Sequence, residues 1–93
     1  MGNLAASRAE LIDGSLTLGV TAAPLSATSV PCTLVVVRAN PDNAGRALVG
    51  NSSSQSMPLD AGDSEAIWTT DLTKVHAKTN NAGDTLEYHA FKF

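Results

Sequence analysis

The stretch Cys32-Thr-Leu-Val-Val-Val-Arg-Ala39 is the strongest strand signal in the sequence. Its three consecutive valines favour β structure, because branching at Cβ restricts the χ1 angle. The run is apolar at odd and even positions alike, which predicts a strand covered on both faces. Asn40-Pro-Asp-Asn-Ala-Gly45 follows directly and is rich in turn-forming residues, so the strand is expected to end there.

Shorter segments of the same kind lie on both sides of this strand. Residues 15–20 alternate apolar and polar side chains, and residues 84–93 place Leu86, Tyr88 and Ala90 on one face. Further short strands are expected within residues 24–28, 46–50, 65–70 and 74–79. Roughly six to eight short antiparallel strands with turns between them predict an all-β fold, a small jelly-roll-like β-sandwich.

Residues 1–13 differ from the remainder of the chain and are expected to form an N-terminal arm, with the sandwich domain at 14–93. The arm is rich in good helix formers, and Leu4, Leu11 and Ile12 fall on roughly one face of a helix. A helix this short is not stable alone. Two interpretations stay open: a frayed terminus, or an arm that becomes ordered against a neighbouring subunit.

Composition limits the classes of partner. The chain has 93 residues, a formal net charge of −3 and scattered basic residues, so neither a nucleic-acid surface nor a membrane partner is expected. No segment approaches the roughly 20 apolar residues that span a bilayer. Cys32 is the only cysteine, which excludes an internal disulfide, and we expect a buried, inert thiol. An unpaired cysteine also fits synthesis in a reducing cytoplasm.

No residue pattern indicates a catalytic centre. His76 and His89 are expected on solvated strand faces, too few to form a zinc site. Asp60, Asp63 and Glu65 surround a turn but lack the spacing of a calcium loop. We therefore predict a protein that is not an enzyme and uses no cofactor and no metal.

The few aromatic residues carry the clearest information on partners. Trp68 has two interpretations: a core residue that anchors the sandwich, which we favour, or an exposed ring that stacks on a sugar or fills an interface pocket. Phe91 and Phe93 alternate with the inward set and so point to the opposite face. Two phenylalanines at a chain end predict burial against a partner, and hence an oligomer.

Six segments follow one another along the chain: Val20-Thr-Ala-Ala-Pro-Leu25, Val30-Pro-Cys-Thr-Leu-Val-Val-Val-Arg-Ala39, Leu48-Val-Gly50, Pro58-Leu-Asp-Ala-Gly-Asp-Ser64, Asp71-Leu-Thr-Lys-Val-His-Ala77 and Ala82-Gly-Asp-Thr-Leu-Glu-Tyr88. This succession of strands and turns resembles a type of small virion protein of tailed bacteriophages. The resemblance covers about residues 15–90 and leaves the N-terminal arm outside it. It is a pattern of turns and strands, and it brings no catalytic residues to this chain.

The resemblance implies a capsid decoration (cement) protein, which binds at capsomer junctions and stabilises the phage head. It implies two partners, the major capsid protein and further copies of the chain, commonly as a homotrimer. Such a protein lies on the capsid surface of the virion and is made in the cytoplasm of the host bacterium. We assign the partner contacts to Leu4, Leu11 and Ile12 in the arm and to Phe91 and Phe93. The alternatives are a tail, baseplate or head-fibre component, or a carbohydrate- or host-surface-binding module on the same fold.

Overall fold

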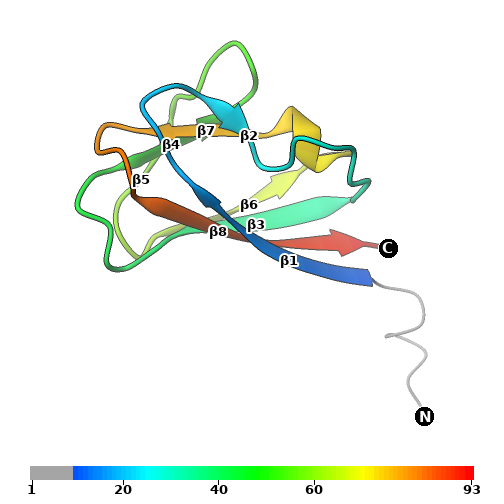
Figure 1. The fold of residues 1–93 in the computed structure, drawn as a ribbon. Coiled ribbons are helices and arrows are strands. Elements are labelled where there is room, and N and C mark those ends of the chain that lie inside the picture. Colours follow the sequence, from blue (N-terminus) through cyan, green and yellow to red (C-terminus); the bar gives the residue numbers. More distant parts are fainter. Residues whose placement is uncertain (1–9) are drawn as a thin grey trace.

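Two antiparallel four-stranded sheets, packed face to face, make up the computed structural model, which describes residues 10–93 (Figure 1). Sheet A has the strand order β1-β8-β3-β6 and sheet B the order β2-β7-β4-β5. The strands are β1 (Glu10–Thr17), β2 (Ala23–Pro24), β3 (Leu34–Ala39), β4 (Ala47–Gly50), β5 (Met57–Leu59), β6 (Ser64–Trp68), β7 (His76–Thr79) and β8 (Thr85–Lys92). A 3-10 helix, η1 (Leu72–Lys74), precedes β7. The predicted all-β sandwich is confirmed.

The strand pairs nest inside one another along the chain. Strand β4 pairs with β5, β3 with β6, β2 with β7 and β1 with β8, as in one long hairpin that has been rolled up. Eight antiparallel strands in two sheets with this order form a jelly roll. The nesting places the start of β1 next to the end of β8, at one end of the sandwich (Figure 1).

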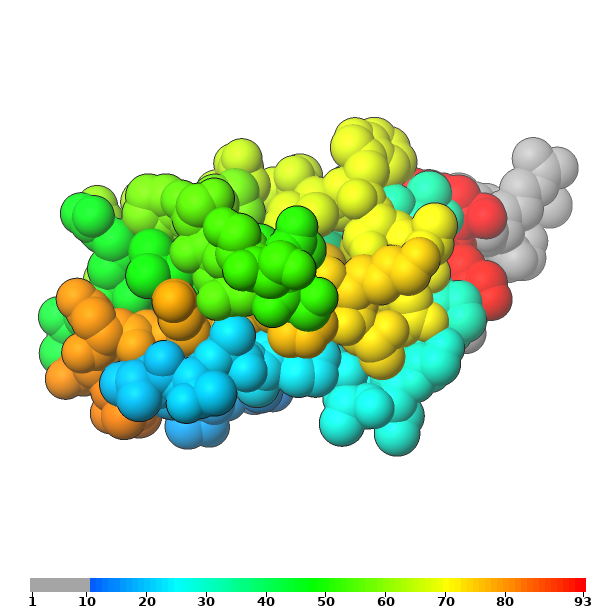
Figure 2. Space-filling model, turned by 90° about the horizontal axis from the view of Figure 1, so that it is seen from above, coloured from blue at the N-terminus to red at the C-terminus, as the bar shows by residue number. Residues whose placement is uncertain are grey.

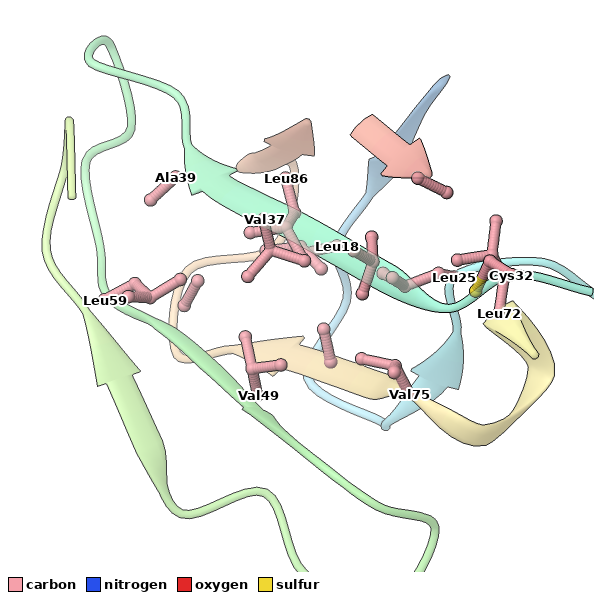
Figure 3. Packing of buried hydrophobic residues seen from close by; sticks show 14 residues of the cluster. Leu18, Leu25, Cys32, Val37, Ala39, Val49, Leu59, Leu72, Val75 and Leu86 are labelled. Carbon is pink, nitrogen blue, oxygen red and sulfur yellow. The ribbon is translucent and has the colours of Figure 1, made fainter. Parts of the chain in front are cut away.

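The core lies between the sheets and is built from aliphatic side chains of modest size. On β3 the side chains of Val35, Val37 and Ala39 are fully buried, whereas Leu34 and Val36 on the other face are only half-buried. The prediction that this strand is covered on both faces is therefore wrong. In Figure 3, Val37 and Leu86 from sheet A and Val49 from sheet B point into the same interior. The whole buried apolar set is Leu18, Leu25, Cys32, Val35, Val37, Ala39, Ala47, Val49, Leu59, Leu72, Val75, Ala77, Leu86 and Ala90.

Strand β1 begins earlier than the sequence indicates. Residues 10–13, expected in the arm, continue the strand to Glu10, with Leu11 opposite Phe91 and Ile12 opposite Ala90. The predicted boundary after Asp13 is thus wrong, because pairing with β8 overrides the helical preference of these residues. Residues 1–9, and with them Leu4, lie outside the described residues.

Gly14 makes room for an aromatic ring at the edge of sheet A. It pairs with Tyr88 on β8, and a Cβ at Gly14 would overlap the Tyr88 ring. A glycine in a strand interior often marks such a close approach. The ring therefore lies across β1 and covers its inner face at the point where β1 has no side chain of its own.

Asp84 joins two loops at the opposite end of the sandwich. Its buried carboxylate accepts hydrogen bonds from the amides of Ala44 (3.1 Å) and Gly45 (2.9 Å), from Thr79 Oγ1 (3.1 Å) and from Asn81 Nδ2 (3.1 Å). Burial alone would raise the pKa of this carboxyl, but the four hydrogen bonds outweigh it and hold the pKa below its usual range. Asp84 therefore ties the turn after β3 to the turn after β7.

Asp71 has the same role at the other end, where it caps η1. Its carboxylate accepts hydrogen bonds from the hydroxyl of Ser29, the amide and hydroxyl of Thr73 (2.9 Å each) and the amide of Val30 (3.0 Å). These bonds, led by the one from Ser29, lower the pKa of Asp71 well below its usual range. The loop before β3 is thereby fixed to the segment between β6 and β7.

The two faces of β3 differ in burial, and substitutions at neighbouring positions should show it. We expect Val37→Ala to lower the free energy of unfolding by about 2 kcal/mol, because it leaves a cavity in the core. The matched variant Val36→Ala, on the outer face, should cost less than about 1 kcal/mol. Urea unfolding of both variants measures the difference, and equal losses would contradict the assignment of faces.

The two bonded aspartates predict a loss of stability in acid. Their folded-state pKa values lie below the value of about 3.9 for an unfolded aspartate, so their contribution is complete above that pH and disappears as the pH falls. We expect the free energy of unfolding to decrease from about pH 5 to about pH 2. Asp84→Asn should be less stable near neutral pH and show a flatter pH dependence. Asp42→Asn, in an exposed position on the turn after β3, is the control and should keep the wild-type dependence.

Candidate interaction surface

A row of four apolar side chains crosses the outer face of sheet A. The strand register places Leu11 of β1 opposite Phe91 of β8, Phe91 opposite Leu34 of β3, and Leu34 opposite Trp68 of β6. Directly opposed residues share a face of the sheet, with Cβ atoms about 4.5–5.5 Å apart. Each of the four strands thus contributes one side chain to a continuous band, which we call the apolar row.

The apolar row faces away from the core. The neighbouring positions Ile12, Ala90, Val35 and Ile67 form the corresponding inner row, in which Ala90 and Val35 are fully buried. On the outer face, by contrast, Trp68 is 74% exposed and Leu11 58%, while Leu34 and Phe91 are half-buried. No described segment covers the row, since β1, β8, β3 and β6 form the outermost layer on this side.

Phe93 extends the row beyond the end of β8. Its ring stacks on that of Phe91, with centroids 6.3 Å apart and 9° between the planes, and 69% of the residue is exposed. The Phe93 amide donates a hydrogen bond to Thr33 Oγ1 (3.4 Å), which holds the chain end against the start of β3. In Figure 2 the yellow end of β6 and the red end of β8 reach the surface at the same end of the molecule.

The polar side chains beside the row pair with one another. In the next row of the outer face, Asp13 Oδ1 lies 2.7 Å from His89 Nδ1. One row further, Arg38 Nη1 lies 3.6 Å from Glu87 Oε1. Both pairs join residues on adjacent strands, so the face changes from apolar to polar without acquiring a strong field of one sign. It suits an apolar partner surface with a polar rim.

The most exposed members of this surface are large aromatic side chains. Trp68 and Phe93 alone expose roughly 300 Å², given areas of about 150–250 Å² for aromatic residues. The largest apolar patch of a folded protein often has this size and is often functional. The apolar row and Phe93 are therefore the candidate interaction surface among the described residues.

The structure brings together three of the residues that the sequence assigns to partner contacts. Leu11, Phe91 and Phe93 all lie on the outer face of sheet A, as the alternation of residues 84–93 predicts for the two phenylalanines. Ile12 points the other way and is partly buried against the core at the edge of the sheet.

Sequence reasoning missed one member of the row, Leu34, and favoured the wrong face for another, Trp68. The favoured placement of Trp68 in the core is wrong, because β6 turns Ile67 and Glu65 inward instead, and the alternative of an exposed ring agrees with the structure. An inward glutamate is tolerated there because β6 is an edge strand, where Glu65 still reaches water. The signal that could have placed Trp68 is its register with β3, which depends on the partner strand rather than on residues 64–68.

The titratable side chains of Cys32 and His76 lie outside this surface. Cys32 is buried as predicted, and burial, together with the nearby charge of Asp71, raises the pKa of its thiol. His76 lies on the outer face of sheet B, as predicted, but it is only partly exposed, and its buried Nδ1 has no hydrogen-bond partner within residues 10–93. Among residues 10–93, no three side chains of His, Cys, Asp or Glu gather closely enough to hold a metal ion.

No helix within the described part of the chain is long and apolar enough to cross a membrane.

Comparison with known proteins adds no relative from which a role could be transferred. No protein-family model matches the chain, and no curated protein matches it in sequence.

Proposed function

We propose that this protein is a non-enzymatic structural protein of a tailed-bacteriophage virion, a capsid decoration (cement) protein. It would bind the major capsid protein at capsomer junctions, through the apolar row and Phe93, and stabilise the head from the capsid surface. The observation that carries the proposal is the exposed apolar row across the outer face of sheet A.

The chemistry of the row favours a protein as its partner. A polyanion would require clustered basic side chains, whereas the two polar pairs beside the row, Asp13–His89 and Arg38–Glu87, each contain an acidic residue. Apolar and aromatic side chains at the centre with polar groups around them are typical of protein–protein interfaces. Trp68, at one end of the row, is the residue type that most often dominates the binding energy of such an interface.

The capsid enters the proposal through the resemblance of residues 15–90 to small virion proteins, together with the jelly-roll order of the strands. A single copy offers a modest interface, but many copies on a symmetric shell multiply it. A tail, baseplate or head-fibre position would use the same surface.

Electron microscopy of particles that carry a tagged copy would distinguish the head from these other positions. The tag belongs at the N-terminus, because Cys32 is buried and its thiol is unsuitable for labelling.

Binding to phage heads tests the proposal directly. The probe is expanded heads assembled from the major capsid protein encoded in the same genome. Wild-type protein should co-sediment with these heads, and Trp68→Ala should weaken binding by roughly 30-fold or more, as expected for an interface hot spot. Val20→Ala is the control, because Val20 is also apolar and 66% exposed but lies outside the row.

Two results would overturn this assignment. A genome without a major capsid gene would remove the proposed partner, and equal binding of wild type and Trp68→Ala would show that the row is not the contact. Because Trp68 is exposed, the variant should keep the wild-type melting temperature, so a loss of binding can be separated from unfolding.

A second candidate is a carbohydrate- or host-surface-binding module, and the exposed ring of Trp68 favours it. A tryptophan on an open sheet face can stack on a sugar ring, and the sequence alone left this interpretation open. A glycan array probed with wild type, Trp68→Ala and Val20→Ala distinguishes the two functions. Glycan binding lost only in Trp68→Ala would support the module, and no glycan binding by wild type would eliminate it.

A further inference from the structure

The four edge strands of the sandwich differ in how they are protected against pairing with another chain. Strands β2 and β5 are two and three residues long, and each contains a proline, Pro24 or Pro58. Strand β6 turns the charged Glu65 inward, opposite the buried Val37. Short length, proline and inward charge are the devices that prevent edge-to-edge association.

Strand β1 is the least protected of the four edges. It is eight residues long, contains neither proline nor a basic residue, and from residue 11 onward turns Ile12, Gly14 and Leu16 inward. Sheet A ends at β1, with no further strand beside it among residues 10–93. A long unprotected edge of this kind is a template for another strand.

The hydrogen-bond pattern shows which groups this edge offers. The Leu18 amide donates to the Asp84 carbonyl (2.7 Å), which continues the β1–β8 register as a hydrogen-bonded pair. Such pairs alternate along an antiparallel ladder, so the even-numbered residues of β1 bond to β8. On the β3 side of β8, the Asn40 amide donates to the carbonyl of Thr85 (3.1 Å). Odd-numbered residues of β8 thus bond to β3, and its even-numbered residues bond to β1. The backbone groups of Leu11, Asp13, Ser15 and Thr17 therefore point outward from the edge.

We propose that β1 of a second copy of this chain pairs antiparallel with this edge, around a two-fold axis at Gly14. The two copies would then share one continuous eight-stranded sheet. In this arrangement Leu11 lies opposite Thr17 of the second copy and Asp13 opposite Ser15 of the second copy. All four outward-pointing residues form hydrogen-bonded pairs, which gives about eight new backbone hydrogen bonds.

Side chains and the number of bonded pairs select this register over its two neighbours. A two-fold axis at Ser15 would leave Leu11 without a partner in β1 and so use only three of the four outward-pointing residues. A two-fold axis at Asp13 would place the two Asp13 carboxylates directly opposite one another, and like charges in that position are destabilising. It would also use only three of the four outward-pointing residues. The axis at Gly14 opposes no like charges and brings Ile12 next to Leu16 of the second copy on the inner face.

Gly14 fits the position on the axis. Opposed residues that are not hydrogen-bonded approach most closely, with Cα atoms about 4.5 Å apart. A residue without a side chain leaves this space to the Tyr88 ring, which already lies across Gly14 in each copy. Ile12 and Leu16, partly buried at the edge, would extend the apolar interior from one copy into the next.

This interface goes beyond the proposed function and uses different atoms. The apolar row lies on the face of sheet A, whereas the self-pairing uses the backbone at its edge. The dimer would present two apolar rows on the same side, which doubles the contact with a partner surface. Trp68→Ala should leave the dimer intact, so either proposal can fail without the other.

The dissociation constant of the full chain, measured by sedimentation equilibrium, tests the pairing and its register. A mass of about 19 kDa is expected, twice the 9.6 kDa of one chain. Ser15→Lys places an ammonium group opposite Asp13 of the second copy and should tighten the dimer. Ser15→Asp places like charges there and should weaken it, each by roughly 2- to 30-fold because two such pairs form per dimer.

Two controls separate pairing from folding. Ser15→Ala adds no charge and should dissociate like the wild type, while Ser15→Pro removes an outward-pointing N–H that β8 does not use and should abolish the dimer. Circular dichroism melts show whether each variant folds, since Ser15 also lies opposite Glu87 within its own chain. A wild-type monomer, a trimer of about 29 kDa (three times 9.6 kDa), or equal effects of lysine and aspartate at position 15 would overturn the proposal.

Discussion

Strand β8 is hydrogen-bonded on both sides, to β1 and to β3, and the rest of sheet A depends on this double pairing. Its even positions supply Leu86 and Ala90 to the core, and its odd positions supply His89 and Phe91 to the outer face. Because β8 fixes the register of both neighbours, it also decides which of their side chains are exposed. The apolar row follows from that register: Phe91 brings Leu11 and Leu34 to the same level of the sheet.

In a sheet that is covered on one face only, apolar residues are expected mainly on the covered face. Sheet A departs from this expectation, because it also carries apolar residues on its outer face. Sheet B covers its inner face, while the outer face keeps Leu34, Val36 and Phe91 half-buried beside the exposed Trp68. The protein has few large side chains, and three of them, Trp68, Phe91 and Phe93, lie outside the core, where exposed apolar surface lowers solubility. Packing of the core does not explain this placement, whereas the proposed interface would.

The clear alternation of residues 84–93 allowed the faces of β8 to be predicted from sequence, since both the inward and the outward set are strongly marked. The predictions failed where the answer depended on a partner strand. Residues 34–37 are apolar throughout, and such a run does not show whether a second layer covers its outer face. For Trp68 the alternation is clear, but the choice between the two faces requires the register of β6 with β3, which places Trp68 opposite Leu34. Asp71 and Asp84 were missed as loop anchors because each collects its donors from segments distant in sequence.

The nesting of strand pairs also constrains how the chain folds. Of the eight strands, β1 is synthesised first and β8 last, and because these two strands pair, sheet A remains incomplete until β8 has been made. Pairing between distant segments is slow, because the loop must close before the contacts form. During that interval β3 exposes apolar side chains on both faces, which makes the nascent chain prone to aggregation. The hairpin of β4 and β5 is the most local pair and is suited to begin sheet B on its own.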